Sequence, residues 1–286
     1  MSTAGNESSD VLNPRVVEAN QRVHSQLASQ YNESEPHFRR ENQDKVRRRL
    51  VDLAARVPST ERMLDLGCGT GFLLNLAHDL FTTIDGIDAT QAMLDRVDLS
   101  PGNITLHQGV VEALPFEPNT FDLATAYSFL DHLADHVPVL HEAHRVLRPG
   151  GMLYVDLIPN RSFWHAVYSA SGSSQRPFDA IVEREINELV NHEQKLQEQF
   201  GIDPVDWQFA EPAKSEGKGF DGEQLRAEVE AAGFTAKIRY EWYLGQAIVM
   251  HGDSMEAADA IDAHLRRLLP VSESLFKYIV LTATKR

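Results

Sequence analysis

The sequence predicts an α/β protein with a doubly wound, mostly parallel sheet that follows an N-terminal helical cap. Two observations support this prediction. Short apolar runs alternate with amphipathic helical stretches from Met63 onward, and a glycine-rich turn joins the first of these runs to a helix. The chain has 286 residues, 42% of them apolar, which is enough for one such domain with insertions.

The elements before the sheet are helical. Residues 1–30 are expected to form a flexible N-terminal arm, disordered to about residue 12 and weakly helical over 13–30, and residues 31–286 are expected to form the domain. Pro36 suits the first turn of a better helix, which Pro58 ends.

The alternating region follows. It predicts strands at 63–66, 82–87, 103–107, 121–127 and 152–158, and helices at 71–80, 91–97 and 135–147. Because ligands on parallel sheets bind beyond the carboxyl ends of the strands, the turns after these strands are where a site is expected.

The stretch 160–220 breaks this rhythm. It is too long for a plain connection, so we expect a lid or association element that includes an acidic helix over 178–200. Aromatic residues gather in and after this insertion, and they form either an acceptor pocket or a small core of their own: Trp164, Tyr168, Trp207, Phe209, Trp242 and Tyr243.

Regular elements return at Asp221, which can cap a helix that Gly233 ends. A strand near 235–243, a helix over 254–269 and a strand over 277–284 complete the prediction.

The composition of the chain limits which partners, cysteine sites and cellular locations are expected. The formal net charge of −15 repels polyanions, so nucleic acid and anionic membranes are not expected as partners. Cys68 is the only cysteine, which excludes disulfides within the chain and cysteine-based zinc clusters. A polar N-terminus and the absence of any long apolar run favour a cytoplasmic location.

The glycine-rich turn is the most informative motif. In Leu64-Asp65-Leu66-Gly67-Cys68-Gly69-Thr70-Gly71, a strand feeds a helix through glycines that let backbone N–H groups approach a ligand. The dinucleotide fingerprint requires a glycine where Phe72 stands. With acidic Asp65 two residues ahead of Gly67, the segment instead resembles the first motif of class I S-adenosylmethionine-dependent methyltransferases.

Later segments extend the resemblance to about residue 158. Asp88 ends the second strand twenty-one residues beyond Gly67, where a carboxylate can accept both ribose hydroxyls. An N-cap or turn role remains its alternative, and Asp85 is the less favoured ribose ligand. After the third strand, Gln108 to Phe116 is similar to the family's adenine-edge motif, although Val110 replaces the usual Asp.

The resemblance implies a seven-stranded Rossmann-like sheet with an antiparallel last strand, and S-adenosylmethionine as cofactor with S-adenosylhomocysteine as product. A tyrosine near the N-terminus closes over the methionine end in similar enzymes, and Arg39 or Arg40 either meets the cofactor carboxylate or faces solvent. The residues that the resemblance assigns to cofactor binding are Tyr31, Asp65, Gly67, Cys68, Gly69, Asp88, Ala89, Met93, Val110, Val111, Glu112 and Tyr127.

The expected reaction is in-line transfer of a methyl group to an O or N atom of a small molecule. His132, just past the fourth strand, is the candidate base, with a packing role as its alternative. No metal is expected, because only Asp131 and Asp135 lie close to the pocket. Two other functions stay open, a non-methyl transfer from the same cofactor or a non-catalytic binding subunit, as does a homodimer.

Overall fold

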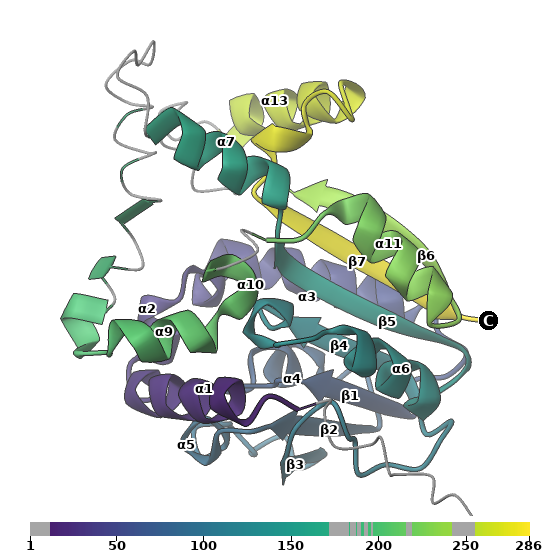
Figure 1. Cartoon of the computed structure of the whole chain (residues 1–286). Coiled ribbons are helices and arrows are strands. Elements are labelled where there is room, and N and C mark those ends of the chain that lie inside the picture. The colour runs from purple at the N-terminus through teal and green to yellow at the C-terminus, as the bar shows by residue number, and fades with distance from the viewer. Residues whose placement is uncertain are drawn as a thin grey trace, which may run out of the picture.

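The computed structural model describes residues 12–171, 197–215, 219–241 and 255–286, with a few single positions between 183 and 195. Its centre is a seven-stranded sheet in the order β3-β2-β1-β4-β5-β7-β6 (Figure 1). The strands are β1 (Arg62–Leu66), β2 (Thr83–Asp88), β3 (Ile104–Gln108), β4 (Phe121–Tyr127), β5 (Leu147–Pro159), β6 (Phe234–Glu241) and β7 (Tyr278–Lys285).

The strand directions confirm the predicted fold class. β1 to β5 pair in parallel, whereas β7 runs antiparallel to both of its neighbours, β5 and β6. The chain moves outward from β1 through β2 to β3 and then returns to the other side of β1 with β4. A crevice therefore opens where the order reverses, beyond the carboxyl ends of β1 and β4.

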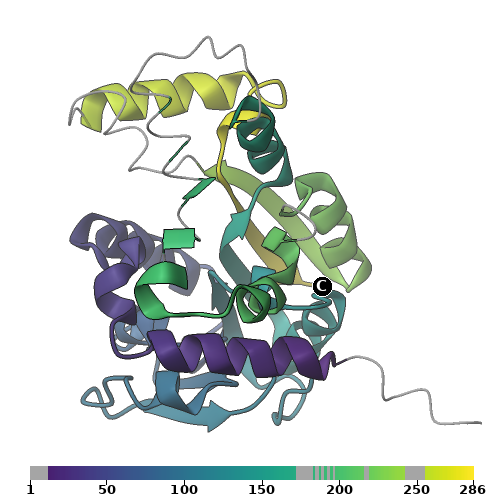
Figure 2. The same cartoon turned by 60° about the vertical axis from the view of Figure 1, so that its left-hand side comes forward.

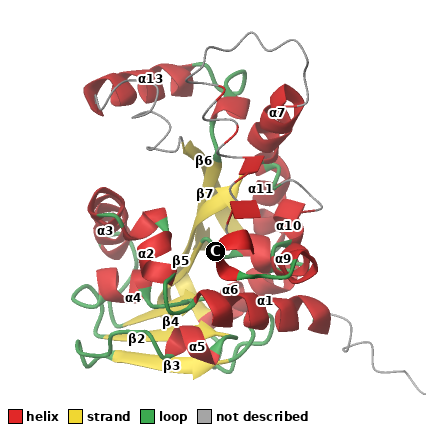
Figure 3. Cartoon of the chain, turned by 90° about the vertical axis from the view of Figure 1, so that its left-hand side faces the viewer, coloured by secondary structure: helices red, strands yellow, loops and turns green. Residues whose placement is uncertain are grey.

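Helices cover both faces of the sheet (Figure 3). One apolar cluster joins the sheet to α3 and α4 and includes Leu50 and Leu73, and a second joins it to α6 and α11 and includes Leu140 and Val229. The helices concerned are α3 (Arg40–Ala54), α4 (Phe72–Ala77), α5 (Gln91–Leu94), α6 (Val137–Val146) and α11 (Gly222–Ala231). Asp221 caps α11 as predicted, since its Oδ1 accepts the N–H of Gln224 at 2.9 Å.

Two expectations for the N-terminal region need correction. The weak helix expected over 13–30 is present as α1 (Pro14–Leu27), but it is packed and does not form a flexible arm, because Val16, Val23 and other apolar residues of one face are buried. The helix expected from Pro36 is divided at Arg39, whose extended backbone separates η1 (Pro36–Phe38) from α3. A short helix, α2 (Tyr31–Ser34), precedes η1.

The insertion contributes α7 (Arg161–Ser171), α9 (Pro204–Ala210) and α10 (Pro212–Ser215). Most of the acidic helix expected over 178–200 lies outside the described residues. α9 lies beside α1 although the two are far apart in the chain (Figure 2). They share a small apolar core, separate from the two main clusters and formed by Ala19, Val23, Leu27, Ile202, Trp207 and Ala210.

A second group of helices lies beyond the ends of two strands, β5 and β7. α7, η3 (Glu273–Leu275) and α13 (Met255–Arg267) lie beyond the ends of β5 and β7 (Figures 1 and 2). Among the described residues, no helix has the length and apolar character that crossing a membrane requires.

Candidate functional site

The glycine-rich turn forms the floor of the site. Gly67, Gly69 and Gly71 all adopt positive φ angles, +65°, +52° and +86°, which side chains disfavour. A Cβ on Gly67 would lie 2.0 Å from Cδ2 of Phe129, so this position also has no room for a methyl group. A Cβ on Gly69 would meet nothing within 4 Å, because Gly69 faces open space.

Asp88 holds this turn against the end of β2. Its Oδ2 accepts the N–H of Gly69 at 2.9 Å and its Oδ1 accepts the N–H of Thr90 at 2.8 Å. Burial raises the pKa of the Asp88 carboxyl, although these backbone donors oppose the shift. Each oxygen keeps a further lone pair, so the carboxylate remains able to accept two more hydrogen bonds.

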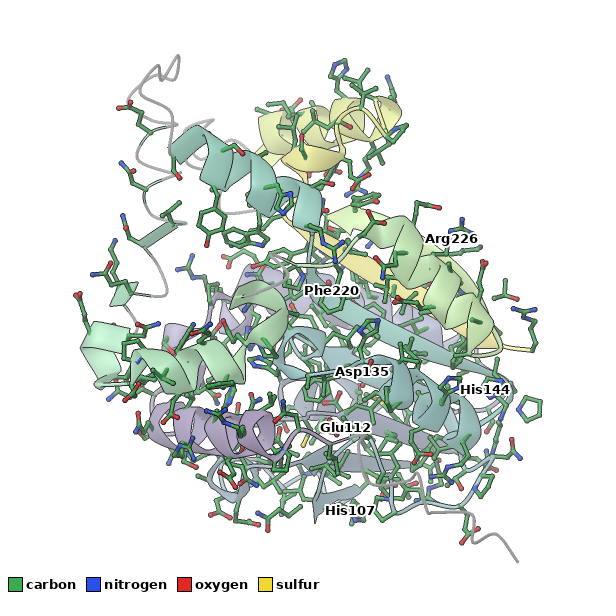
Figure 4. The ribbon with its side chains drawn as sticks, in the orientation of Figure 1. His107, Glu112, Asp135, His144, Phe220 and Arg226 are labelled. Carbon is green, nitrogen blue, oxygen red and sulfur yellow. The ribbon has the colours of Figure 1, made fainter. Side chains whose placement is uncertain are left out.

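Asp85, the less favoured ribose ligand, has a structural role. Its carboxylate oxygens contact Arg62 Nη2 at 2.7 Å and His107 Nε2 at 2.8 Å, and it does not line the cavity. His107 belongs to β3 and lies near the lower edge of the view (Figure 4). Asp85 therefore ties neighbouring strands together.

One cavity lies above the turn and contains about 970 Å³ of space, part of it open to solvent. It is lined by every residue that the sequence assigned to the site. These residues are Tyr31, Asp65, Gly67, Cys68, Gly69, Asp88, Ala89, Met93, Val110, Val111, Glu112, Tyr127 and His132. The structure thus brings them together, while their contact with a cofactor remains a prediction.

The end of the cavity beyond β2 and β3 is lined by Val110, Val111 and Glu112. Partial burial raises the pKa of the Glu112 carboxyl. With Val110 in place of the acid that the resembling family usually carries, Glu112 and backbone groups are the polar groups that this loop offers to the cavity.

The end of the cavity beyond β4 is more aromatic. Tyr31 and His37 approach from the N-terminal cap, with their ring centroids 5.9 Å apart, and Phe72 and Tyr127 approach from the floor, 4.9 Å apart. Burial lowers the pKa of His37 to about 3, so this ring is neutral near pH 7. Sequence reasoning missed His37, which follows Pro36 in a three-residue helix without a pattern of its own.

A side-chain hydrogen bond joins the N-terminal cap to the glycine-rich turn. Thr70 Oγ1 donates to Asn32 Oδ1 at 2.6 Å, which places α2 over the turn. Arg39 and Arg40 are exposed and do not line the cavity, so their solvent-facing interpretation is the one that fits.

His132 lies in η2 (Leu130–His132), directly after the end of β4. Its Nδ1 lies 2.8 Å from the carbonyl oxygen of Ala210, the last residue of α9. Ser128, at the start of this loop, has a φ of +51°, which turns the chain sharply at the cavity wall.

The roof of the cavity is α1, which sequence reasoning missed as a site element. Val16, Asn20 and His24 of α1 line the cavity. Asn20 Nδ2 donates to the carbonyl of His132, and Gln21 Nε2 donates to the carbonyl of Ala89, each at 3.0 Å. The i, i+4 spacing of Asn20 and His24, beside an apolar stripe, was the available signal.

A charged cluster lies behind His132. Asp131, His132 and Glu211 each have one potential metal-ligand atom, a carboxylate oxygen or a ring nitrogen, and these atoms lie within 4.8 Å of one another. This set of residue types suits a metal ion. However, Lys214 Nζ contacts Asp131 Oδ2 at 2.7 Å and Glu211 Oε1 at 3.0 Å. Although burial opposes it, this ammonium lowers the pKa of Asp131. The cluster thus carries its own cation and anchors α10 to η2.

The aromatic residues of the insertion do not line the cavity where they are described. Trp207 and Phe209 belong to the core that α1 and α9 share, and Trp164 and Tyr168 lie on α7. For Trp207 and Phe209 the core alternative is therefore correct. Trp242 and Tyr243 lie outside the described residues.

Comparison with known proteins agrees with this geometry. Residues 64–155 match the family model described as a methyltransferase domain. A curated relative, the ubiquinone biosynthesis O-methyltransferase of Azotobacter vinelandii, is 34% identical over 103 residues, which are 34% of this chain and 44% of the relative. The chain spans less than half the length of such curated relatives.

Solved structures share the fold over most of the chain. A methyltransferase of Thermotoga maritima, described as a possible histamine N-methyltransferase, is 17% identical with a TM-score of 0.51, over 92% of this chain and 100% of that one. The [4+2]-cyclase SpnF is 19% identical with a TM-score of 0.55, over 97% and 99% of the two chains.

Proposed function

We propose that this chain is a class I S-adenosylmethionine-dependent methyltransferase that moves a methyl group to an O or N atom of a small molecule; the match of residues 64–155 to a methyltransferase domain and the shared fold support this. The observation that supports this most is the gathering of all thirteen motif residues around one cavity at the switch point of the sheet. Fold alone does not choose the reaction, since SpnF, a cyclase, shares it.

The residues of the cavity fit S-adenosylmethionine. Gly69 leaves its side of the turn open for an adenosyl group, and the half-buried Asp88 carboxylate retains acceptor capacity for two ribose hydroxyls. Ala89 and Met93 follow β2 on the side where the adenine ring would lie. Tyr127, at the end of β4, lies where the methionine end would extend.

The cofactor supplies a methyl group on a sulfonium, which is already a strong electrophile. The chain must align the acceptor in line with the bond that breaks, exclude water and take a proton where the acceptor has one. α1 lines one side of the cavity, and α9 packs against α1. His132 is the residue we assign to take the proton; it lines the cavity, and its Nδ1 lies 2.8 Å from the carbonyl oxygen of Ala210, which supports this role.

Cofactor binding to matched variants tests this proposal. Asp88→Ala should weaken S-adenosylmethionine binding by about 2 kcal/mol, roughly 30-fold, because two charge-assisted hydrogen bonds are lost. Asp85→Ala, which changes a carboxylate on the same strand outside the cavity, should leave the affinity unchanged. Titration calorimetry measures both affinities.

Activity is tested by incubation with S-adenosylmethionine and a metabolite extract, followed by mass spectrometry. A product heavier by one methylene unit supports the proposal. Another transferred group, or binding without turnover, would assign the non-methyl or the non-catalytic alternative instead.

A further inference from the structure

Two histidines of the cavity wall are held in a known tautomer. His132 Nδ1 lies 2.8 Å from the carbonyl oxygen of Ala210, and His24 Nδ1 lies 3.0 Å from that of Asn20. A carbonyl oxygen only accepts hydrogen bonds, so in each neutral ring Nδ1 carries the hydrogen and Nε2 keeps a lone pair. No described residue bonds either Nε2. The rings meet edge to face, with centroids 4.9 Å apart.

Asn20 adds a third acceptor to this wall. Its Nδ2 donates to the carbonyls of Val16 and His132, both at 3.0 Å, which uses both amide hydrogens and fixes the orientation of the side chain. Its Oδ1 bonds no described residue. Since Asn20, His24 and His132 all line the cavity, this wall offers three acceptors while its side-chain N–H groups are already bonded. A ligand that lies against it must donate hydrogen bonds.

Charge limits which donors suit this wall. Lysine and arginine are absent from the described residues that line the cavity. A carboxylate or phosphate group on the methyl acceptor would therefore find no cationic side chain there. A cation is also disfavoured at this wall, because burial, with the nearby charge of Lys214, lowers the pKa of His24 to about 3. Hydroxyl groups are donors that avoid both penalties.

The remaining lining residues near this wall are apolar. Val16, Phe129 and Leu133 line the cavity beside the two histidines. Such a surface suits the flat face of a ring, whose hydroxyl groups would then point at the imidazoles.

We propose that the methyl acceptor is an uncharged ring with two adjacent hydroxyl groups, held by His24 and His132; this inference rests on the proposed methyl transfer. His132 Nε2 takes the proton of one hydroxyl group, while the oxygen of that hydroxyl forms a bond to the methyl carbon. The electron pair of the broken C–S bond stays on sulfur, which becomes a neutral thioether. His24 Nε2 accepts a hydrogen bond from the second hydroxyl and keeps its own protonation state.

Catechol and phenol, which differ by one hydroxyl, test the role of His24. With S-adenosylhomocysteine already bound to the full chain, catechol should bind about tenfold more tightly than phenol, because one further hydrogen bond forms. In His24→Phe, which keeps an aromatic ring without the acceptor, this ratio should fall to about one. In His24→Gln, whose amide oxygen is again an acceptor, the ratio should recover. Calorimetry with each probe measures the ratios.

Several outcomes would overturn the inference. These are equal binding of catechol and phenol to the unaltered chain, an unchanged ratio in His24→Phe, no recovery in His24→Gln, tighter binding of benzylamine than of catechol, or no binding by any probe. Failure of S-adenosylhomocysteine to bind in the first titration would instead refute the proposed function. The two failures are therefore distinguished within one experiment.

Discussion

The floor and the roof of the cavity are built differently. The floor consists of turns that follow β1, β2 and β4, and backbone N–H groups and positive φ angles fix its shape. The roof is α1, which shares a small core with α9 and meets the floor through a few hydrogen bonds, such as that of Gln21 with Ala89. The backbone thus fixes the shape of the floor, whereas side-chain packing holds the roof in place above it.

This difference predicts where substitutions act. A substitution that adds side-chain atoms to the floor should reduce stability where those atoms point into the protein, and should weaken ligand binding where they point into the cavity. Changes in the roof should loosen the cover and leave the sheet intact, because its core is separate from the two clusters that hold the sheet.

The largest effect on the stability of the sheet itself is expected at Gly67. Gly67→Ala should destabilise the fold by about 2–4 kcal/mol, because the new Cβ would lie 2.0 Å from the Phe129 ring and the φ of +65° is unfavourable for alanine. Thermal or urea unfolding measures the loss.

Gly69→Ala is the matched control in the same turn. Its Cβ would point into open space, so the cost to stability should be about 1 kcal/mol for the positive φ alone, while cofactor affinity falls at least tenfold. Equal destabilisation by the two substitutions would show that the Phe129 contact does not shape the floor.

The second effect is expected at Trp207, in the core that α9 shares with the roof. Trp207→Ala should remove about 3 kcal/mol or more from the packing of α9 on α1, since the indole is buried in their shared core. Amide hydrogen exchange of Pro14–Leu27 should accelerate, and cofactor affinity should fall, while exchange in β1 and β4 stays slow.

Trp207→Phe separates ring packing from the indole N–H. The Nε1 atom of Trp207 is buried and has no partner among the described residues, so its loss should cost less than the loss of the ring. If Trp207→Ala instead melts the whole chain in one transition, the roof is not a separate cooperative unit.

The same difference explains which parts of the site could be predicted. The floor depends on glycines at fixed spacing and on Asp88 at the end of an apolar run, and both are visible in the sequence because a backbone conformation restricts the residue at its own position. The strands were predicted within a few residues for the same reason, except that β5 begins earlier, at Leu147, through an irregular register with β4.

The roof could not be predicted in this way. Asn20 and His24 face the cavity only because α1 packs on Trp207 and its neighbours, and no local pattern links these distant segments. Glu211 and Lys214 join Asp131 for the same reason. The sequence showed an amphipathic helix in α1, but the partner of its apolar face comes from the insertion, so the helix was assigned to a flexible arm.

The smallest of the three effects concerns pH and the floor alone. Burial raises the pKa of Asp65 from 3.8 to about 7, although the Thr125 hydroxyl, which donates to its Oδ1 at 2.7 Å, opposes the shift. The folded chain therefore holds a proton that the unfolded chain releases near pH 4. The contribution of Asp65 to stability is complete below pH 4 and is lost as pH rises through about 7.

Asp65→Asn should remove this pH dependence, because a neutral amide keeps the acceptor for Thr125 and cannot ionise. At pH 8 the variant should be more stable than the unaltered chain by about 1–3 kcal/mol, and near pH 4 the two should be nearly equal. Urea unfolding at several pH values measures the difference. A parallel pH dependence in both proteins would show that Asp65 is ionised in the folded floor.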